Sequence, residues 1–333
     1  TYNVGIDLAL FRNRLEFTAE WYKNTSEDLL YAVPVPEQAG VSNTTVTMNA
    51  ASMNNSGFEF SATYRNRDHD FKYEVSANLS TLRNRVTSLG FGTDSYISGS
   101  YITKVGQEIG QFYGWVYEGI ARTQEDLDNH ATQEGAQIGD CLYKDVNNDG
   151  KVDSEDQVVL GSGMPKINFG LNARFEYKRF DLSIATFGAL NYHVSDDIYN
   201  SLNSCYGWGN KEVGMLEANR FSEDGSTYLS NVPRTYVTNS ASLGWNDLFS
   251  SRKIQNAAYW KIANVELGYN FPDKWFGKYV SDVRFYVSAQ NLHTFTGYHG
   301  YNVDYAGGTF TPGYNFCSYP TARTFMCGVH FTF

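Results

Sequence analysis

Apolar and polar side chains alternate through the last ten residues of the chain. Five apolar groups occupy every second position, namely Phe325, Cys327, Val329, Phe331 and Phe333. Because successive side chains of an extended backbone point to opposite sides, this period of two places all five on one face of a β-strand. A soluble edge strand usually carries a charge or a proline near its end, whereas this strand keeps its apolar row up to its last residue. The pattern is typical of a strand between lipid and a polar lumen.

Eight further segments show the same alternation: 2–10, 15–22, 58–65, 71–79, 167–177, 180–190, 257–271 and 283–292. The connections between these nine segments are alternately short and long, as in bacterial outer-membrane barrels. The long ones include a Ser/Thr/Asn-rich stretch, 25–54, and the largest insertion, 83–166. We therefore predict an all-β fold, an antiparallel transmembrane β-barrel segment of nine strands with long extracellular loops. The alternative, a soluble β-sandwich, requires polar outward faces, which these strands lack.

Nine strands do not close a barrel, since an open sheet edge in hydrocarbon is very costly and bacterial single-chain barrels have even strand counts. We expect a larger N-terminal portion to exist outside this chain. The chain starts at Thr1 with no signal-peptide pattern, which agrees with a mature or internal fragment. Residues 1–333 are thus predicted to be the C-terminal part of one barrel domain.

The composition agrees with a β-rich membrane protein. Aromatic residues make up 16% of the 333 residues, and 30 Gly accompany only 7 Pro. No run approaches the roughly 20 apolar residues of a membrane helix, and the mean hydropathy of -0.42 alone would suggest a soluble protein. Alternation removes this conflict, because barrel strands expose only half of their residues to lipid. The formal charge of -10 argues against a nucleic-acid partner.

The four cysteines show no metal-type spacing and no C-x-x-C pair. Cys327 lies on the apolar face of the last strand, and we expect it to be a buried thiol. The pairing of Cys141, Cys205 and Cys317 stays open, with a Cys205 to Cys317 bridge as one possibility.

One loop in the largest insertion, 145–156, has the spacing of an EF-hand-like calcium site. Its candidate ligands fall at loop positions 1, 3, 5, 7, 9 and 12, which are Asp145, Asn147, Asp149, Lys151 through its carbonyl, Asp153 and Asp156. Gly150 occupies the sharp-turn position, and Asp replaces the usual Glu at position 12. The competing interpretation is a solvated acidic turn. If Ca²⁺ binds, we expect a structural role in which binding energy orders the loop.

Several stretches carry a family resemblance, in this order along the chain: VGQEIGQFYGWVYEGI (105–120), YKDVNNDG (143–150), YWKIANVELGYNFP (259–272), AQNLHTFTGYHGY (289–301) and YPTARTF (319–325). They resemble the C-terminal half of SusC-like TonB-dependent transporters of Bacteroidetes. The resemblance implies a barrel of about 22 strands around an N-terminal plug, of which this chain supplies strands 14 to 22. It also implies an outer-membrane location with a periplasmic C-terminus, TonB as the energy source, and a SusD-like lipoprotein over the extracellular mouth. By the same resemblance, we expect the plug domain and the TonB contact to be absent from this chain.

Aromatic side chains in the long loops are candidates for substrate contact, because their faces stack on the C–H faces of sugars. The candidates are Tyr206, Trp208, Trp245, Tyr298, Tyr301 and Tyr305. Each could instead pack loop on loop or against a lipoprotein partner. Trp115 lies in a family motif and is expected to be structural. Inward positions on the strands should line the lumen or contact the plug, namely Glu16, Glu20, Glu59, Arg65 and Arg174.

No enzyme is expected, since the six histidines show no paired spacing and no G-x-S-x-G elbow occurs. The resemblance favours TonB-dependent import of an oligosaccharide with a SusD-like partner. Two alternatives stay open: the same machine importing peptides, and a non-transporting, calcium-stabilised adhesin or lectin.

Overall fold

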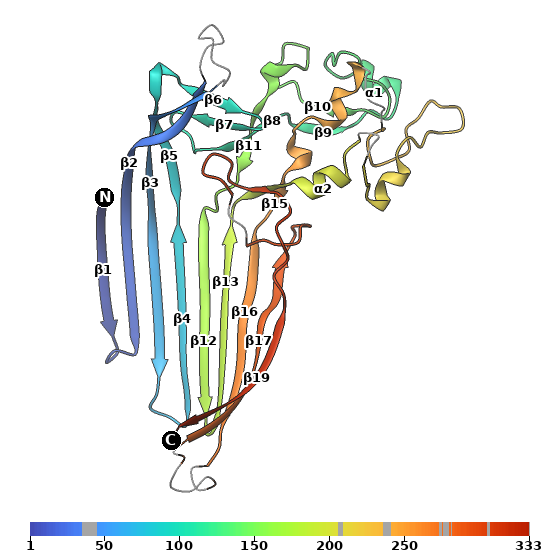
Figure 1. Ribbon diagram of the computed structural model, residues 1–333. Helices are drawn as coiled ribbons and strands as arrows, with labels where there is room; N and C mark the ends of the chain where they lie inside the picture. The colour runs from blue at the N-terminus through green and yellow to red at the C-terminus, as the bar shows by residue number, and fades with distance from the viewer. Residues whose placement is uncertain are drawn as a thin grey trace.

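One antiparallel sheet of ten strands dominates the computed structural model (Figure 1). The structure describes residues 1–34, 45–205, 209–235, 241–272, 275, 280, 282–304 and 307–332. Nine strands follow one another across the sheet: β1 (Tyr2–Leu10), β2 (Leu15–Pro34), β3 (Thr45–Asn66), β4 (Phe71–Thr81), β12 (Ile167–Tyr177), β13 (Phe180–Leu190), β16 (Tyr259–Asn270), β17 (Asp282–Thr296) and β19 (Thr324–Thr332). The tenth, β5 (Arg83–Leu89), pairs with β3. The nine predicted strands are thus confirmed, in sequence order.

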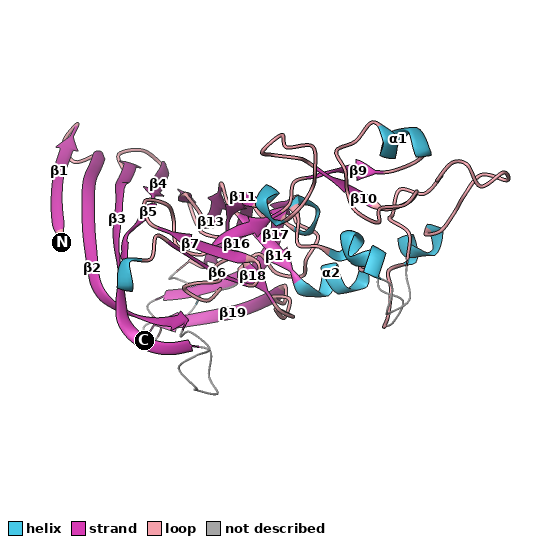
Figure 2. Cartoon of the chain, turned by 90° about the horizontal axis from the view of Figure 1, so that it is seen from above, coloured by secondary structure: helices cyan, strands magenta, loops and turns pink. Residues whose placement is uncertain are grey.

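The connections separate by length to the two ends of the sheet. Figure 1 shows the short turns gathered at one end and all the large insertions at the other. Seen from above, the sheet is curved, with β1 at one edge and β19 at the other (Figure 2). Among the helices of the described residues, none has both the length and the apolarity that a membrane span requires.

The pairing register aligns apolar side chains in rows across neighbouring strands. One row runs through five of them: Phe175, Leu182, Leu267, Val287 and Cys327. Leu267 is 45% exposed and Val287 is 41% exposed. Among the described residues, no second protein layer covers these rows, which is the arrangement a lipid-facing surface requires. We call this face the outer face. It carries Cys327, whose thiol is exposed there and not buried as predicted.

The opposite face, here the inner face, carries polar side chains in the same register. The adjacent row contains the polar residues Arg174, Ser183, Glu266 and Ser288, and it ends at Met326. Because every strand of the sheet has one apolar and one polar side, the two faces must meet different surroundings.

The prediction of a loop over 25–54 is wrong at both of its ends. Strand β2 continues to Pro34 and β3 begins at Thr45, with register shifts between Ser26 and Leu30. This part of the ladder pairs polar residues, such as Thr25 with Asn54. Backbone hydrogen bonding therefore extends beyond the amphipathic stretch that revealed the strands.

The insertions fold into small sheets and short helices at the loop end. The remaining strands are β6 (Ser95–Ser98), β7 (Tyr101–Lys104), β8 (Gln111–Gly114), β9 (Tyr117–Ile120), β10 (Cys141–Tyr143), β11 (Val158–Ser162), β14 (His193–Asp196), β15 (Gln255–Asn256) and β18 (Tyr314–Asn315). The α-helices are α1 (Gln124–Asp128) and α2 (Asp197–Leu202), and the 3-10 helices are η2 (Gly90–Gly92), η3 (Ser154–Asp156), η4 (Val213–Glu217), η5 (Ala241–Asp247) and η6 (Ser251–Lys253). A capping box begins α1, where Thr123 and Asp126 satisfy each other's backbone N–H groups.

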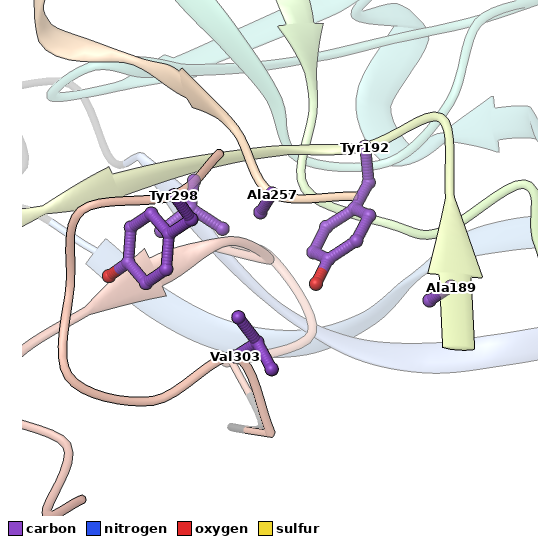
Figure 3. Close-up of a cluster of buried hydrophobic side chains, with 6 residues drawn as sticks. Ala189, Tyr192, Ala257, Tyr298 and Val303 are labelled. Atoms are coloured by element: carbon purple, nitrogen blue, oxygen red, sulfur yellow. The ribbon is translucent and has the colours of Figure 1, made fainter. Parts of the chain in front are cut away.

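Three clusters of buried apolar side chains lie at the loop end. The rim cluster contains Ala189, Tyr192, Val194, Ala257, Tyr298 and Val303. Ala257 and Val303 lie between the rings of Tyr192 and Tyr298 (Figure 3). A second cluster joins the upper part of β3 to β5 and Ile109, and a third, the insertion cluster, consists of Cys141, Tyr143 and Val152. The first two clusters therefore attach the insertions to the rim of the sheet.

Aromatic rings gather at the short-turn end, as a girdle at a membrane interface would. Tyr177 ends β12 and lies 6.4 Å from Phe71, and Phe271 lies 5.8 Å from Trp275. Trp21, by contrast, lies within the long strand β2, which continues to Pro34.

Candidate calcium loop and inner face

The acidic loop 145–156 is closed by hydrogen bonds from its own backbone. The Asp145 carboxylate accepts hydrogen bonds from the N–H of Asn148 at 2.7 Å and of Gly150 at 2.9 Å. Asn147 Oδ1 accepts one from the N–H of Asp149 at 2.9 Å. Asn148 and Gly150 have φ of 60° and 87°, so the sharp turn requires residues that tolerate the left-handed region. The turn lies where the calcium-loop spacing places it.

Asp156 closes the loop from its other end. Its buried carboxylate accepts hydrogen bonds from the N–H groups of Val146 at 2.7 Å, Asn147 at 3.3 Å and Asp153 at 2.9 Å. Burial opposes ionisation of this carboxyl, but the three N–H donors outweigh it, so the pKa of Asp156 lies below its ordinary value. The position-12 residue thus holds the two ends of the loop together as an ionised group.

These contacts bear on calcium in two ways. The six predicted ligands lie within one twelve-residue loop, and Gly150 has the positive φ that suits its sharp-turn position. Across the residues that the structure describes, however, no three His, Cys, Asp or Glu side chains converge as a metal centre. The carboxylates instead bond to backbone amides. The residue types suit a hard, oxygen-seeking cation, and calcium binding stays a prediction.

The loop is anchored to the rest of the insertions. The indole of Trp115 donates a hydrogen bond to the Asp153 carbonyl at 2.9 Å, and Trp115 packs against the insertion cluster. The N–H of Thr132 donates to the Gly150 carbonyl at 2.9 Å. Any ordering of this loop would therefore pass to the neighbouring segments.

Charged side chains form ion pairs on the inner face near the short turns. Arg65 lies 2.6 Å from Glu16 and 2.9 Å from Glu74, and Glu20 stands directly opposite Glu59. Four of these five residues are among the predicted inward positions, and the register places them all on one face.

A second group lies further along the same face. Arg284 pairs with Asp181, and its guanidinium lies 2.7 Å from Glu266. Arg174 lies 3.0 Å from Glu176 on its own strand. Arg284 belongs to no sequence motif, although its position between Val283 and Phe285 places it on the inner face by alternation. The inner face at this end is thus densely charged.

The sequence was compared with protein families and with curated proteins. No family model matches the sequence. The chain is 31% identical over 350 residues to the TonB-dependent receptor P3 of Formosa agariphila, an alignment that covers 99% of this chain and 34% of that receptor. It is 25% identical over 340 residues to the TonB-dependent receptor SusC of Bacteroides thetaiotaomicron, covering 100% of this chain and 32% of SusC. Along its whole length the chain is similar to SusC-like TonB-dependent receptors.

The solved structures confirm the fold of this SusC-like chain. The RagAB peptide transporter matches it with a TM-score of 0.80 at 22% identity, covering 99% of this chain and 34% of the other. The RagAB importer in its open-open state gives a TM-score of 0.75 at 23% identity, with the same coverage. The chain spans about a third of the length of the curated relatives it matches. Those relatives carry the names of receptors, not of enzymes.

Of the six predicted substrate aromatics, the structure describes Trp245, Tyr298 and Tyr301. Tyr206, Trp208 and Tyr305 lie outside the described residues. The half-buried Trp245 donates a hydrogen bond to the Glu134 carbonyl at 2.8 Å and packs on the insertion cluster.

The other two aromatics lie apart from Trp245. Tyr298 belongs to the buried rim cluster, where its hydroxyl bonds Asp196 and accepts a hydrogen bond from Asn315 at 2.7 Å. Tyr301 is 67% exposed. Substrate contact stays a prediction for these rings, and the packing of Tyr298 already accounts for its presence.

Sequence reasoning missed an ion pair high on the inner face. Lys261 of β16 pairs with Asp304 of the last insertion, and the Lys261 side chain is only 4% exposed. Simple alternation along β16 would place Lys261 on the outer face with Leu267, and the β-bulge between Ile262 and Asn264 turns it inward. Nothing local in the sequence joins it to a residue in a loop 43 positions later. Only the return of that loop onto the sheet brings the two charges together.

Proposed function

We propose that the protein containing this chain imports an oligosaccharide across the outer membrane, with energy from TonB and together with a SusD-like surface lipoprotein. The observation that supports this most directly is the sheet itself, with continuous apolar rows on one face and polar or ionised side chains on the other. Such a sheet suits a wall between bilayer and aqueous lumen. Similarity to the TonB-dependent receptors supports the transport role.

In this proposal residues 1–333 form the C-terminal part of the barrel wall. The long insertions, including 83–166 with its calcium loop, face the cell exterior, and the C-terminus lies on the periplasmic side. The segregation of short turns to one end of the sheet supports that orientation (Figure 1). The plug, the TonB contact and the closing strands belong to the remainder of the protein.

Peptide import is the second candidate function, and the solved structures that share this fold include the RagAB peptide transporter. At 22% identity that match speaks for the fold alone. The third hypothesis, a non-transporting adhesin or lectin, lacks comparable support, because the relatives are named TonB-dependent receptors.

We further propose a structural Ca²⁺ in the loop 145–156. The support is the ligand spacing, the left-handed turn at Asn148 and Gly150, and the ionised Asp156 that closes the loop. The ion would order the insertion and take no part in chemistry.

Growth and uptake of a strain that lacks the whole receptor test the function. We expect loss of growth on one neutral oligosaccharide, with growth on monosaccharide and on peptides unchanged, and the same loss when TonB is deleted. Restoration by the complete receptor gene is the control. Loss of growth on peptides alone would establish the second candidate, and unchanged growth and uptake on every nutrient would refute import.

A further inference from the structure

A cavity of about 450 Å³ lies on the inner face of the sheet, beneath the loops of the rim. Its floor comes from the strands, through Asn168, Phe187 and Tyr259, whose register places them on the inner face. Tyr192 and Asp304, from two separate insertions, cover it. The volume is within the range of small-molecule sites. In an importer, this cavity would open onto the path that the substrate takes.

The acidic group of the cavity has unused hydrogen-bonding capacity. One carboxylate oxygen of Asp304, Oδ2, pairs with Lys261. The other, Oδ1, is buried and has no hydrogen-bond partner in the described part of the chain. Leaving a buried charged oxygen unbonded is costly, so a ligand that donates a hydrogen bond here would recover that energy.

The hydroxyl of Tyr192 offers a second polar group. It makes no hydrogen bond to the described residues, although the ring is only 4% exposed. Burial, with Tyr259 and Asp304 nearby, raises the pKa of Tyr192, so its hydroxyl remains protonated and can donate or accept. Figure 3 shows this ring projecting from its loop toward the segment that carries Val303.

Two aromatic rings also line the cavity. The rings of Tyr259 and Phe187 meet edge to face, with centroids 6.1 Å apart and an interplanar angle of 84°. The Lys261 ammonium lies 5.8 Å from the Phe187 centroid and is already paired with Asp304. The cavity therefore combines apolar ring surface with hydrogen-bonding groups and a charge pair that sums to zero.

We propose that this cavity binds one neutral sugar unit of the transported oligosaccharide, a proposal that rests on the import function above. Sugar hydroxyls would donate to Asp304 Oδ1 and bond the Tyr192 hydroxyl, while C–H faces contact the rings of Tyr259 and Phe187. Net neutrality disfavours a peptide terminus, because the carboxylate that would attract its ammonium group is already neutralised by Lys261.

Binding to the purified, complete receptor tests this site. The probes are neutral malto-, cello-, laminari-, manno- and xylo-oligosaccharides, with a mixed peptide pool as comparison, and the readout is calorimetric affinity. Tyr192→Phe removes only a hydroxyl without a described partner, so the fold should be kept. Asp304→Asn removes the charged acceptor. We expect each variant to weaken binding of the preferred glycan by about tenfold or more.

The matched control is Glu266→Gln on the same strand and face as Tyr259. It also removes the acidic member of an ion pair, while Arg284 keeps its second partner, Asp181. Its glycan affinity should equal that of the wild type. If the receptor binds a glycan but Tyr192→Phe and Asp304→Asn bind it equally well, the site is wrong and oligosaccharide import stands. If only peptides bind, both the site and the proposed substrate class are wrong.

Discussion

Leu171 and Asn172 are adjacent residues in the middle of β12 whose side chains point to opposite faces of the sheet. Leu171 is 42% exposed on the outer face, and Asn172 is exposed on the inner face. If the outer face meets hydrocarbon, Leu171→Arg buries a cation near the bilayer midplane, at a cost of about 2–4 kcal/mol. Asn172→Arg places the same side chain in the aqueous lumen, at little cost.

The two variants therefore differ by about 30-fold to about 1,000-fold in the folding equilibrium of the barrel. The assay is denaturant unfolding of the complete receptor in lipid vesicles, followed by tryptophan fluorescence. The temperature at which the folded band disappears from a gel gives a second measure of stability. Leu171→Arg should unfold at clearly lower denaturant, and Asn172→Arg should match the wild type. A stable Leu171→Arg protein, or an equally destabilised Asn172→Arg protein, would contradict the assignment of lipid to the outer face.

Three further predictions concern the insertions. Asp145→Ala should speed proteolysis within 123–166 and abolish the effect of chelator; cleavage that is equal with and without chelator in the wild type would count against calcium. The pKa of Asp156 is depressed, so its contribution to loop stability is present above about pH 4, the ordinary aspartate range. In chelator, amide protection of the loop should consequently fall as the pH drops below that value, and acid-independent protection would refute this role. Asp140→Ala leaves the Arg234 guanidinium, 17% exposed, without its buried partner and should destabilise the insertions by about 3 kcal/mol, measured by hydrogen exchange; unchanged exchange there would show that the pair is dispensable.

The membrane strands were predictable because alternation is imposed by two solvents along their whole length. On β17 and β19, Phe285 and Val329 stand opposite each other on the outer face, as the period of two requires. The same signal could not reveal the far ends of β2 and β3, where Thr25 pairs with Asn54. A strand that leaves the bilayer keeps its backbone ladder and loses its need for an apolar side.

The loop end was less predictable for a different reason. The acidic loop is formed by residues within twelve positions, and its contacts run between Asp145 and Asp156 as the spacing indicated. The Asp140 to Arg234 pair joins positions 94 apart. Such pairs depend on how whole insertions fold back onto the rim of the sheet. The local sequence pattern does not reveal this long-range arrangement.

The rim cluster and the insertion cluster stabilise different parts of the chain. The rim cluster includes Ala189 from the end of β13, so it ties the insertions to the sheet, whereas the insertion cluster draws on the insertions alone. Loss of Asp140 affects the insertion cluster, because the Asp140 carboxylate and the Cys141 N–H both bond Asn246. The stability of the outer rows of the sheet does not depend on either cluster, because lipid covers these side chains. Asp140→Ala should therefore loosen the insertions while the barrel keeps the heat resistance that Leu171→Arg removes.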